Sequence, residues 1–361
     1  MKTLSLFAAM LALAACTPDF DPASQVEGLR VLAVRADPPE IAPASSGAPA
    51  PDRAALTALV LRGDIASDPT RQTTVVYLVC LPVPGDPTPT PCVALASLRD
   101  PTVALAEVAS AGCDAPAAGA PSPLVAFAGA ERCEGGACVP VVLDGGIALP
   151  PPAVAIPADY GFDALPAGAP DRILGVQAVA LAFAIDARPE ELVEGASGSC
   201  PLASVAGRLA ELWAAREHVL VTKRVQIRGP EAPDAPNQNP VLDGIAADGS
   251  PIAEDEPPEI ATGKRLLTPV LPADADALRV TYTKLDAAGQ PLESAREDWV
   301  YSWFSTAGDL EDLHTRDPEA EEWTIAAADA SASGGRALVA LVLRDLRGGV
   351  AWTVREVALA Q

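Results

Sequence analysis

The feature that most constrains the fold is a series of short β-type runs separated by turn residues in the C-terminal half. Residues 336–359, RALVALVLRDLRGGVAWTVREVAL, contain two such runs joined by RDLRGG, whose glycines predict a hairpin turn. Upstream, KRLLTPVL and LRVTYTKLD predict strands, AAGQ predicts a turn, and WVYSWFS places Trp299, Tyr301 and Trp303 on one face of a strand. Short strands between turn signals favour two antiparallel sheets packed as a sandwich.

The second run of this hairpin carries apolar residues on both of its faces. Val350 and Trp352 share one face by the period of two, whereas Val357 and Leu359 lie on the opposite face. One extra residue in a strand exchanges the two faces, so the pattern predicts a β-bulge near 355–356.

The N-terminal half begins with the same kind of pattern. Its runs LRVLAVRAD, AALTALVLRGD and TTVVYLVCLP predict strands, as do the long apolar run at 172–186 and HVLVTKRVQI at 218–227. Between the last two, residues 200–218 predict a helix that begins at Pro201, because large apolar residues recur there at helical spacing. The Pro- and Ala-rich stretch 229–239 predicts a linker.

The YSWF run and the final LVLRDLRGGVAW hairpin resemble bacterial immunoglobulin-like domains of the PKD type. The resemblance implies that the Tyr-x-Trp strand packs in a core, so Trp303 is expected to be buried. It also implies that the hairpin supplies the last two strands. STAGDLEDL follows the Trp strand, where PKD domains carry an acidic glycine turn. The opening of the chain is similar to bacterial immunoglobulin-like domains as well.

These patterns predict an all-β fold of two immunoglobulin-like antiparallel β-sandwich domains, the first with a disulfide-stapled insertion and one short helix. We place the first domain, with a Cys-rich insertion, at residues 28–228 and the second at 240–361. The two halves are compatible with diverged copies of one sandwich plan.

The first residues of the chain resemble an export signal that ends in an attachment point. Lys2 precedes an apolar run from Leu4 to Ala15, which is shorter than the roughly 20 residues that a membrane-spanning helix needs. The run ends in LAAC, which resembles the lipobox of bacterial lipoproteins. That resemblance implies a signal peptide at 1–15, lipidation of Cys16 and a lipidated tether at 16–27. The alternative is an ordinary secretory signal with an unmodified Cys16.

Composition narrows the class of protein further. The chain has 361 residues, of which 49% are hydrophobic, so a sizeable core can form, and its 37 prolines and 27 glycines predict many loops. Its net charge of −23 repels phosphate backbones, so no nucleic-acid partner is expected. After the leader no uninterrupted apolar stretch reaches 18 residues, so no transmembrane helix is expected.

The cysteines support export to an oxidising compartment. Apart from Cys16, six remain, an even number that permits three disulfides in 15 connectivities. They are Cys80, Cys92, Cys113, Cys133, Cys138 and Cys200. The short spacings suggest Cys133–Cys138 and Cys80–Cys92, which would leave Cys113 to pair with Cys200. A zinc cluster is disfavoured because paired C-x₂-C units are absent from the sequence.

Catalytic motifs are scarce. His218 and His314 lie 96 residues apart in different predicted domains, and the GASGSC stretch lacks the spacing of a G-x-S-x-G nucleophile turn. Cys200 as a nucleophile would need a base and a lowered pKa, and an oxidising compartment favours its pairing in a disulfide. The glycine pairs DGG and RGG lack the lysine of a phosphate-binding loop. We therefore expect neither an enzyme nor a cofactor.

Acidic loops raise the question of a metal. Asp309, Glu311 and Asp312 are weak calcium candidates, because hard cations bind several oxygens supplied by such loops. A second acidic stretch lies at 253–259, and neither stretch matches an EF-hand loop. Solvated acidic loops are the simpler interpretation, and no metal site is assigned.

Three functions remain open at this stage. The first is a non-catalytic envelope lipoprotein whose sandwiches act as spacer or binding modules at the cell surface or in the periplasm. By the resemblance to bacterial lipoproteins, Thr17 after Cys16 implies delivery to the outer membrane. Its expected partners are the membrane, through the N-terminal lipid, and an envelope protein or glycan. The second is an accessory subunit of an envelope assembly that docks through the Cys-rich insertion. The third is a hydrolase on an unfamiliar scaffold.

Overall fold

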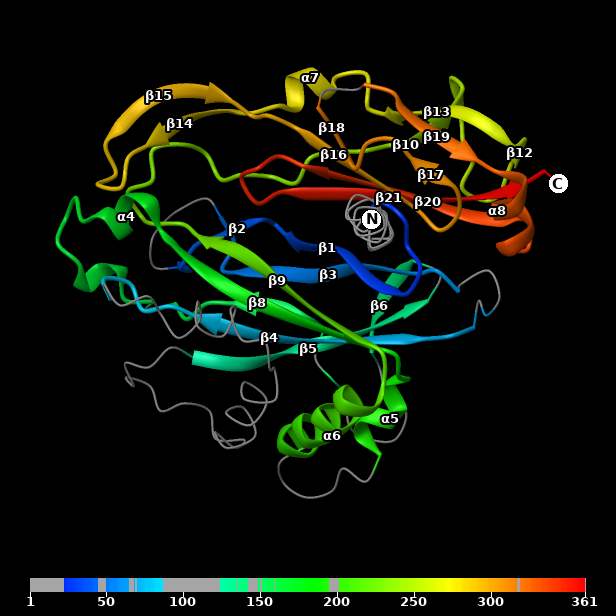
Figure 1. Cartoon of the computed structure of the whole chain (residues 1–361). Helices are drawn as coiled ribbons and strands as arrows, with labels where there is room; N and C mark the ends of the chain where they lie inside the picture. Colours follow the sequence, from blue (N-terminus) through cyan, green and yellow to red (C-terminus); the bar gives the residue numbers. More distant parts are fainter. Residues whose placement is uncertain are drawn as a thin grey trace, which may run out of the picture.

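Four β-sheets lie on top of one another in the computed structural model (Figure 1). The structure describes residues 23–44, 50–64, 68, 70–86, 124–134, 136–141, 149, 151–158, 160–194, 201–316 and 319–360. We number the sheets I to IV in the order in which they stack. Sheets I and II form the first sandwich, and sheets III and IV form the second, which confirms the predicted all-β sandwich fold.

The first sandwich uses the N-terminal half of the chain. Sheet I has the order β2 (Glu40–Ile41), β9 (His218–Ile227), β8 (Val176–Ile185), β4 (Thr73–Leu81), β5 (Leu124–Glu134) and β6 (Ala137–Pro140). Sheet II has the order β1 (Leu29–Asp37), β3 (Arg53–Arg62) and β7 (Ala153–Ala155). The helical segments of this half are η2 (Phe162–Ala164), α4 (Pro170–Leu174), α5 (Pro189–Val193) and α6 (Pro201–Ala215).

The second sandwich uses the C-terminal half. Sheet III has the order β12 (Glu259–Ile260), β21 (Val350–Leu359), β20 (Arg336–Arg344), β16 (Val300–Ser305) and β18 (His314–Arg316). Sheet IV has the order β11 (Ser250–Pro251), β10 (Gly244–Ala247), β13 (Gly263–Val270), β19 (Glu321–Ile325) and β17 (Asp309–Leu310). The remaining elements are α7 (Ala275–Leu278), α8 (Ala327–Ala332) and a separate hairpin of β14 (Thr281–Leu285) and β15 (Pro291–Arg296).

The two sandwiches share one strand plan. In each, the last two strands pair with each other and with a strand from the middle of the half, as β9–β8–β4 and as β21–β20–β16. In each, a two-residue strand also pairs in parallel with the last strand, β2 with β9 and β12 with β21. The facing sheets contain β1–β3–β7 and β10–β13–β19. These sets correspond to the G–F–C and A–B–E strands of immunoglobulin domains.

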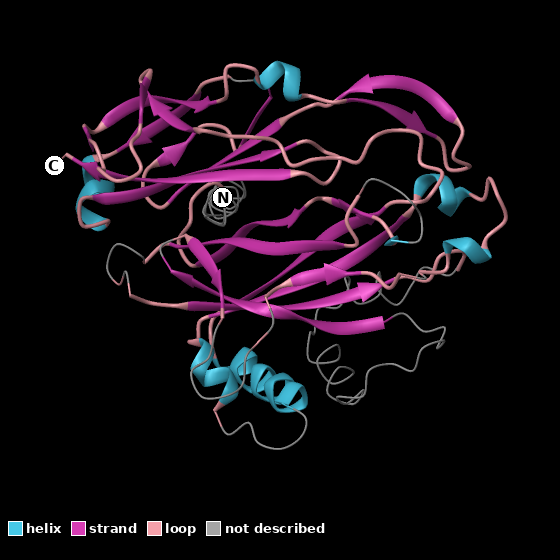
Figure 2. Ribbon diagram, turned by 180° about the vertical axis from the view of Figure 1, so that it is seen from behind, coloured by secondary structure: helices cyan, strands magenta, loops and turns pink. Residues whose placement is uncertain are grey.

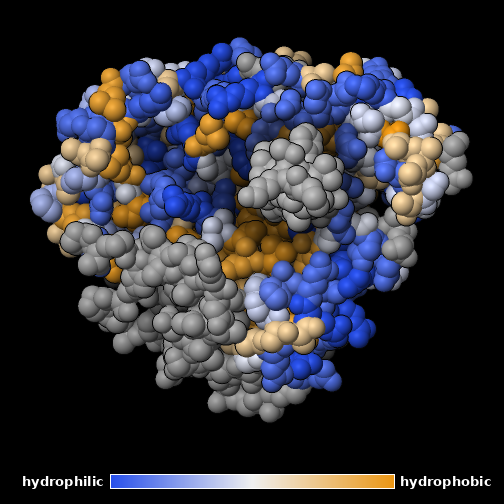
Figure 3. Space-filling model, viewed as in Figure 1, coloured by the Kyte–Doolittle hydropathy of each residue, from blue (hydrophilic) through white to orange (hydrophobic). Residues whose placement is uncertain are grey.

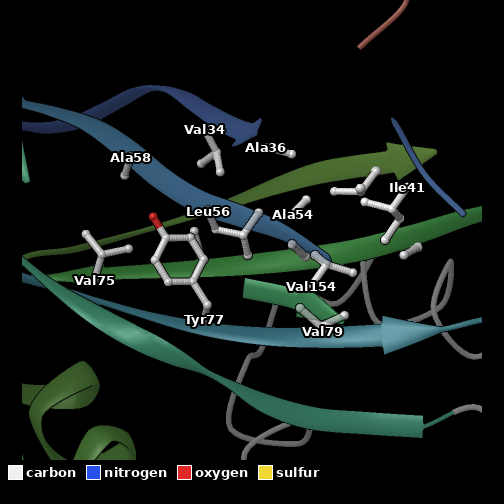
Figure 4. Close-up of a cluster of buried hydrophobic side chains, with 14 of the residues drawn as sticks. Val34, Ala36, Ile41, Ala54, Leu56, Ala58, Val75, Tyr77, Val79 and Val154 are labelled. Carbon is white, nitrogen blue, oxygen red and sulfur yellow. The ribbon is translucent and has the colours of Figure 1, made fainter. Parts of the chain in front are cut away.

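Each sandwich has its own apolar core. In the first, Val34 and Leu56 of sheet II face Tyr77 and Val79 of β4 (Figure 4). In the second, the aromatic stripe of β16 is buried as predicted, and Trp303 is 0% exposed. Its indole Nε1 donates a hydrogen bond to Thr315 Oγ1 at 3.1 Å, which satisfies the polar atom of a buried tryptophan.

Sheet III is covered on both faces, and this coverage corrects the predicted bulge. β20 and β21 pair without a register shift from Arg336↔Ala358 to Arg344↔Val350. Val350 and Trp352 pack toward sheet II, whereas Val357 and Leu359 pack toward sheet IV. Both faces of the strand are apolar because each face contacts another sheet, so no extra residue is needed.

The contact between sheets II and III is a third apolar layer. Leu59 and Leu61 of β3 meet Ala340 and Val342 of β20, and all four are at most 1% exposed. A packed apolar layer of this kind resists relative motion of the domains. The two sandwiches are therefore joined through their sheets as well as through the chain.

The helix α6 covers the outer face of sheet I (Figure 2). It begins at Pro201, as predicted. Leu209 and Trp213 are buried against Val76, Leu78 and Phe183 of the sheet, and the Trp213 and Phe183 rings meet edge to face at 5.5 Å. Sheet I, like sheet III, is thus apolar on both faces.

The segment 229–239 connects β9 to β10 and is fixed to both sandwiches. Asn239 Nδ2 donates a hydrogen bond to the Ala36 carbonyl at 2.9 Å, and its Oδ1 accepts one from Val350 N at 2.9 Å. Asn237 is 1% exposed. The connection is therefore part of the interface between the sandwiches.

The end of the predicted tether also lies against the second sandwich. Val26 N donates a hydrogen bond to the Ser305 carbonyl at 2.8 Å, and Ser305 N donates one to the Ser24 carbonyl at 3.0 Å. Val26 is 1% exposed. Residues 24–26 thus extend sheet III beside β16 before the chain enters β1.

Candidate binding cleft between the two sandwiches

The β14–β15 hairpin forms an arch from the second sandwich to the first. Both views show its curved strands reaching toward α4 (Figures 1 and 2). Its tip is the predicted AAGQ turn, in which Asp286 Oδ1 accepts hydrogen bonds from Ala288 N and Gln290 N. Gly289 lies so close to Ile173 of α4 that a Cβ there would be 3.1 Å from that side chain. The arch therefore rests on the first sandwich.

A hollow of about 440 Å³ lies beneath this arch, and we call it the arch cleft. Ile173 and Leu174 of α4 line it on one side, and Leu285 and Leu292 of the hairpin line it on the other. Leu292 is 66% exposed. Ligand pockets occur preferentially at domain boundaries and combine apolar walls with a few polar groups, which is the composition found here.

The floor of the arch cleft is an ion pair that joins the two sandwiches. Glu40 Oε2 accepts hydrogen bonds from Arg228 Nη1 at 3.3 Å and from Asn237 N at 2.9 Å. Glu40 Oε1 lies 3.7 Å from Arg347 Nη2. Arg228 follows β9, whereas Arg347 belongs to the β20–β21 turn. Glu40 is thus paired with one arginine from each sandwich.

Arg347 is itself held from three sides. Its Nη1 donates a hydrogen bond to Glu297 Oε1 at 3.0 Å, and its guanidinium lies 4.5 Å from the ring centroid of Tyr282 in the arch. Burial raises the pKa of Glu297, although Val280 N and Arg347 oppose the rise. Each of these buried charges thus has an opposite charge nearby, which offsets part of the cost of removing it from water.

The β20–β21 turn is fixed by its own aspartate. Asp345 Oδ1 accepts hydrogen bonds from Arg347 N and Gly349 N, both at 2.8 Å. Asp345 Oδ2 accepts one from Asn237 Nδ2 at 2.7 Å. The predicted hairpin turn is thereby confirmed, and its side chains set the position of Arg347 in the cleft.

The structure confirms one of the predicted disulfides. Cys133 and Cys138 form a disulfide at the β5–β6 connection, as the short spacing suggested. Cys80 is also disulfide-bonded. Cys92, Cys113 and Cys200 lie outside the described residues, so the pairings suggested for them stay predictions. Cys16 also lies outside the described residues.

The carboxylates of the calcium candidates, Asp309, Glu311 and Asp312, do not form a group of potential ligands within 4.8 Å of one another among the described residues. Asp309 is in β17, Glu311 N donates to the Glu322 carbonyl, and Asp312 N donates to Glu321 Oε1 at 2.8 Å. Among the described residues, the single group of three potential ligands within 4.8 Å is Glu131 with Cys133 and Cys138. The disulfide occupies both sulfurs of that group.

The two histidines occupy separate places. The His218 ring stacks at 4.0 Å on Trp213, and its Nδ1 lies 2.9 Å from the Arg216 carbonyl. His314 Nδ1 lies 2.9 Å from Ser302 Oγ. Ser302 is 0% exposed and accepts a hydrogen bond from Arg344 Nη1 at 2.7 Å, so this serine is shielded from an external substrate.

Sequence reasoning missed the charged floor of the arch cleft. Glu40, Arg228 and Arg347 come from three distant segments: Glu40 begins β2, Arg228 directly follows β9, and Arg347 lies in the turn between β20 and β21. The RDLRGG motif indicated a turn without indicating that its second arginine pairs across the domains. The sequence signal that could have indicated this charged floor is the presence of charged residues next to predicted strand ends.

Comparisons with known proteins yield only distant structural likenesses. No protein-family model matches the chain, and no curated protein matches it. One similar solved structure is a Ca²⁺-stabilised adhesin that helps an Antarctic bacterium to reach out and bind ice, with 10% identity and a TM-score of 0.20. The match covers 93% of this chain and 50% of that chain.

A second similar structure concerns host cell surface retention of a 1.5-MDa bacterial ice-binding adhesin. It has 8% identity and a TM-score of 0.19, and the match covers 93% of this chain and 67% of that chain. Likenesses at these scores carry no argument about function. In the part of the chain that the structure describes, no helix has the length and apolarity to cross a membrane.

Proposed function

We propose that this protein is a non-catalytic, lipid-anchored protein of the bacterial cell envelope, with its two sandwiches acting as a binding or spacer module. The arch cleft carries the proposal, because it is an open hollow with apolar walls and a paired ionic floor at a domain boundary. Its ligand is an envelope protein or a glycan, and the anchor is in the outer membrane.

Lipid anchoring is supported by the LAAC sequence that ends the apolar leader. Residues 24–26 pair with β16, so a tether from Cys16 to the folded body is short. Several acyl chains on one cysteine bind a bilayer firmly, since each buried CH₂ contributes about 0.8 kcal/mol. Disulfides at Cys80 and at Cys133–Cys138 fit an oxidising compartment.

A rigid body of two sandwiches suits both a binding module and a spacer. The apolar layer between sheets II and III and the fixed turn at Asp345 hold the sandwiches in one arrangement. A rigid body keeps the arch cleft formed before binding, so little conformational entropy is lost when a partner docks.

The anchor is tested by mass spectrometry of the mature N-terminus and by fractionation of envelopes. The expected result is an acylated Cys16 in the outer-membrane fraction. The Cys16→Ser variant is expected to lack the acyl mass and to leave that fraction. An unmodified N-terminus on a cytosolic protein with reduced thiols would refute the proposal.

The cleft is tested by crosslinking in intact envelopes with the full chain. Leu292→Glu places a charge on the wall of the arch cleft, whereas Leu266→Glu alters a leucine that is 51% exposed outside it. We expect the Leu292 variant to lose the crosslinked partner and the Leu266 variant to keep it. Equal recovery of the same partner by both variants would show that the arch cleft is not the binding surface.

A further inference from the structure

A second hollow adjoins the β20–β21 turn and is independent of the arch cleft. It has a volume of about 370 Å³ and is lined by residues 31–34 of β1, 221–223 of β9 and, around the turn, Arg344, Leu346 and residues 348–350. We call it the Lys223 hollow. Figure 3 shows apolar side chains gathered at the centre of one face, over the strands of the first sandwich, whereas hydrophilic residues dominate the second sandwich above.

Two cationic side chains line this hollow without a carboxylate partner. Lys223 is 9% exposed, and its Nζ donates a hydrogen bond to the Gly348 carbonyl at 2.5 Å. Arg344 donates from Nη1 to Ser302 Oγ at 2.7 Å and from Nη2 to the Leu32 carbonyl at 2.9 Å. Within the described part of the chain, no carboxylate oxygen lies within 4.0 Å of either cation.

Burial acts on both cations. It lowers the pKa of Lys223 to about 8, with the charge of Asp345 opposing the fall and that of Arg344 adding to it. Burial also lowers the pKa of Arg344. The chain has 48 acidic residues and only four lysines, so a buried lysine with no carboxylate oxygen of the described residues within 4.0 Å is unusual in this protein. Such exceptions to local stability rules are expected at functional sites.

A second exception lies at the rim of the same hollow. Leu346 is 62% exposed and has a φ of 60°, a conformation that branched apolar residues rarely adopt. Its neighbours in the lining include Val31, Val34, Val221 and Val350. A polar residue or a glycine would suit this turn position better, so the leucine adds an apolar surface beside the two cations.

We propose that the Lys223 hollow binds a small organic carboxylate. The carboxylate oxygens accept charge-assisted hydrogen bonds from Lys223 Nζ and from Arg344. The bound carboxylate thereby places a negative charge beside both cations. An aliphatic body lies against Leu346 and the valines of the lining. The volume of the hollow is within the range of small-molecule sites. This inference depends neither on the lipid anchor nor on the arch cleft.

The direct test is calorimetric titration of the full chain with octanoate. We expect saturable binding that weakens at least about tenfold in Lys223→Met, because one charge-assisted hydrogen bond is lost. Lys284→Met is the matched control, since Lys284 pairs with Glu293 on the exposed arch hairpin. No saturable binding by the natural chain, or equal binding by Lys223→Met, would overturn the proposal.

Three further measurements test the organic carboxylate, the folding of the variant and the role of Lys223. Acetate and inorganic phosphate are expected to bind at least about tenfold more weakly than octanoate, because neither carries an apolar body. Equal affinity for phosphate would refute the organic carboxylate. Thermal unfolding of Lys223→Met is expected to match or exceed that of the natural chain, so that lost binding is not lost folding. Octanoate is also expected to raise the pKa of Lys223, followed by NMR of the ¹³C-methylated lysines.

Discussion

The guanidinium carbon of Arg35 lies 5.0 Å from the ring centroid of Trp352, which joins β1 of the first sandwich to β21 of the second. A cation–π contact of this kind contributes about 0.5–2 kcal/mol, depending on its exposure to water. It lies beside the apolar layer of sheets II and III, so the boundary between the sandwiches combines apolar packing with a directed polar contact.

This boundary predicts that the two sandwiches unfold together. Val342 faces sheet II and is 0% exposed, so Val342→Asp buries an unpaired charge in the interface while leaving each sandwich core intact. We expect one calorimetric transition in the natural chain and two in this variant. Val339→Asp, on the same strand but facing the core of the second sandwich, should retain only the transition of the first sandwich. One undivided transition in Val342→Asp would contradict this coupling.

A buried glutamate predicts a pH dependence of stability. Glu131 is 1% exposed, and its Oε2 accepts hydrogen bonds from Ala58 N at 2.9 Å and from Tyr77 Oη at 2.8 Å. Burial raises its pKa from 4.5 to about 7, opposed by those hydrogen bonds, by Thr57 and by the charge of Arg35. The folded state therefore binds this proton more tightly than the unfolded state does.

The sign of the effect follows from that difference. Tighter proton binding by Glu131 in the folded state adds about 3 kcal/mol to the free energy of unfolding. This contribution is fully present below pH 4.5 and is lost as the pH rises through about 7. In Glu131→Gln, we expect the free energy of unfolding to exceed that of the natural chain above pH 7 and to converge with it toward pH 4.5. Urea unfolding between pH 5 and pH 8 measures this, with Glu293→Gln as an exposed control. Parallel curves for the natural chain and Glu131→Gln would exclude the effect.

The Cys133–Cys138 disulfide predicts a modest loss of stability on removal. The bond closes a loop between residues separated by five positions, and a loop this short gives about 2 kcal/mol by chain entropy. The double variant Cys133→Ala/Cys138→Ala is therefore expected to unfold at a lower urea concentration with an unchanged slope. Thiol titration of the unfolded natural chain should detect neither cysteine before reduction. Free thiols at both positions would contradict the assignment.

Two glycines with positive φ angles, Gly175 and Gly168, differ in the space around them. Gly175 ends α4 with a φ of 72°, and a Cβ there would lie 2.2 Å from the Ile227 carbonyl oxygen. Gly168 has a φ of 76° with open space around its Cβ position. Both alanine variants incur the backbone penalty of about 1 kcal/mol, but Gly175→Ala adds a steric clash with the backbone.

We expect Gly175→Ala to lower the melting temperature clearly more than Gly168→Ala does. Because α4 supports the tip of the arch at Gly289, the Gly175 variant should also increase hydrogen exchange in β14 and β15. Equal melting temperatures for the two variants would show that the approach of Gly175 to β9 is not close in solution.

Local patterns predicted much of the architecture. The strand runs, the helix that begins at Pro201 and the Cys133–Cys138 bond follow from residue spacing within one segment, whereas the burial of Trp303 was implied by the resemblance to PKD-type domains. The bulge near Arg355 was wrong because the sequence pattern records which faces of a strand are apolar without recording how many sheets cover them.

The amino-acid sequence alone determined which segments become strands, because a period of two and turn residues act between neighbours in the chain. Only the tertiary structure decided that sheet II packs on sheet III, that Glu40 pairs with both Arg228 and Arg347, and that no carboxylate oxygen of the described residues lies within 4.0 Å of Lys223 Nζ. Those relationships join residues far apart in sequence. Their energies depend on distance and burial in the folded chain, and no local pattern contains either quantity.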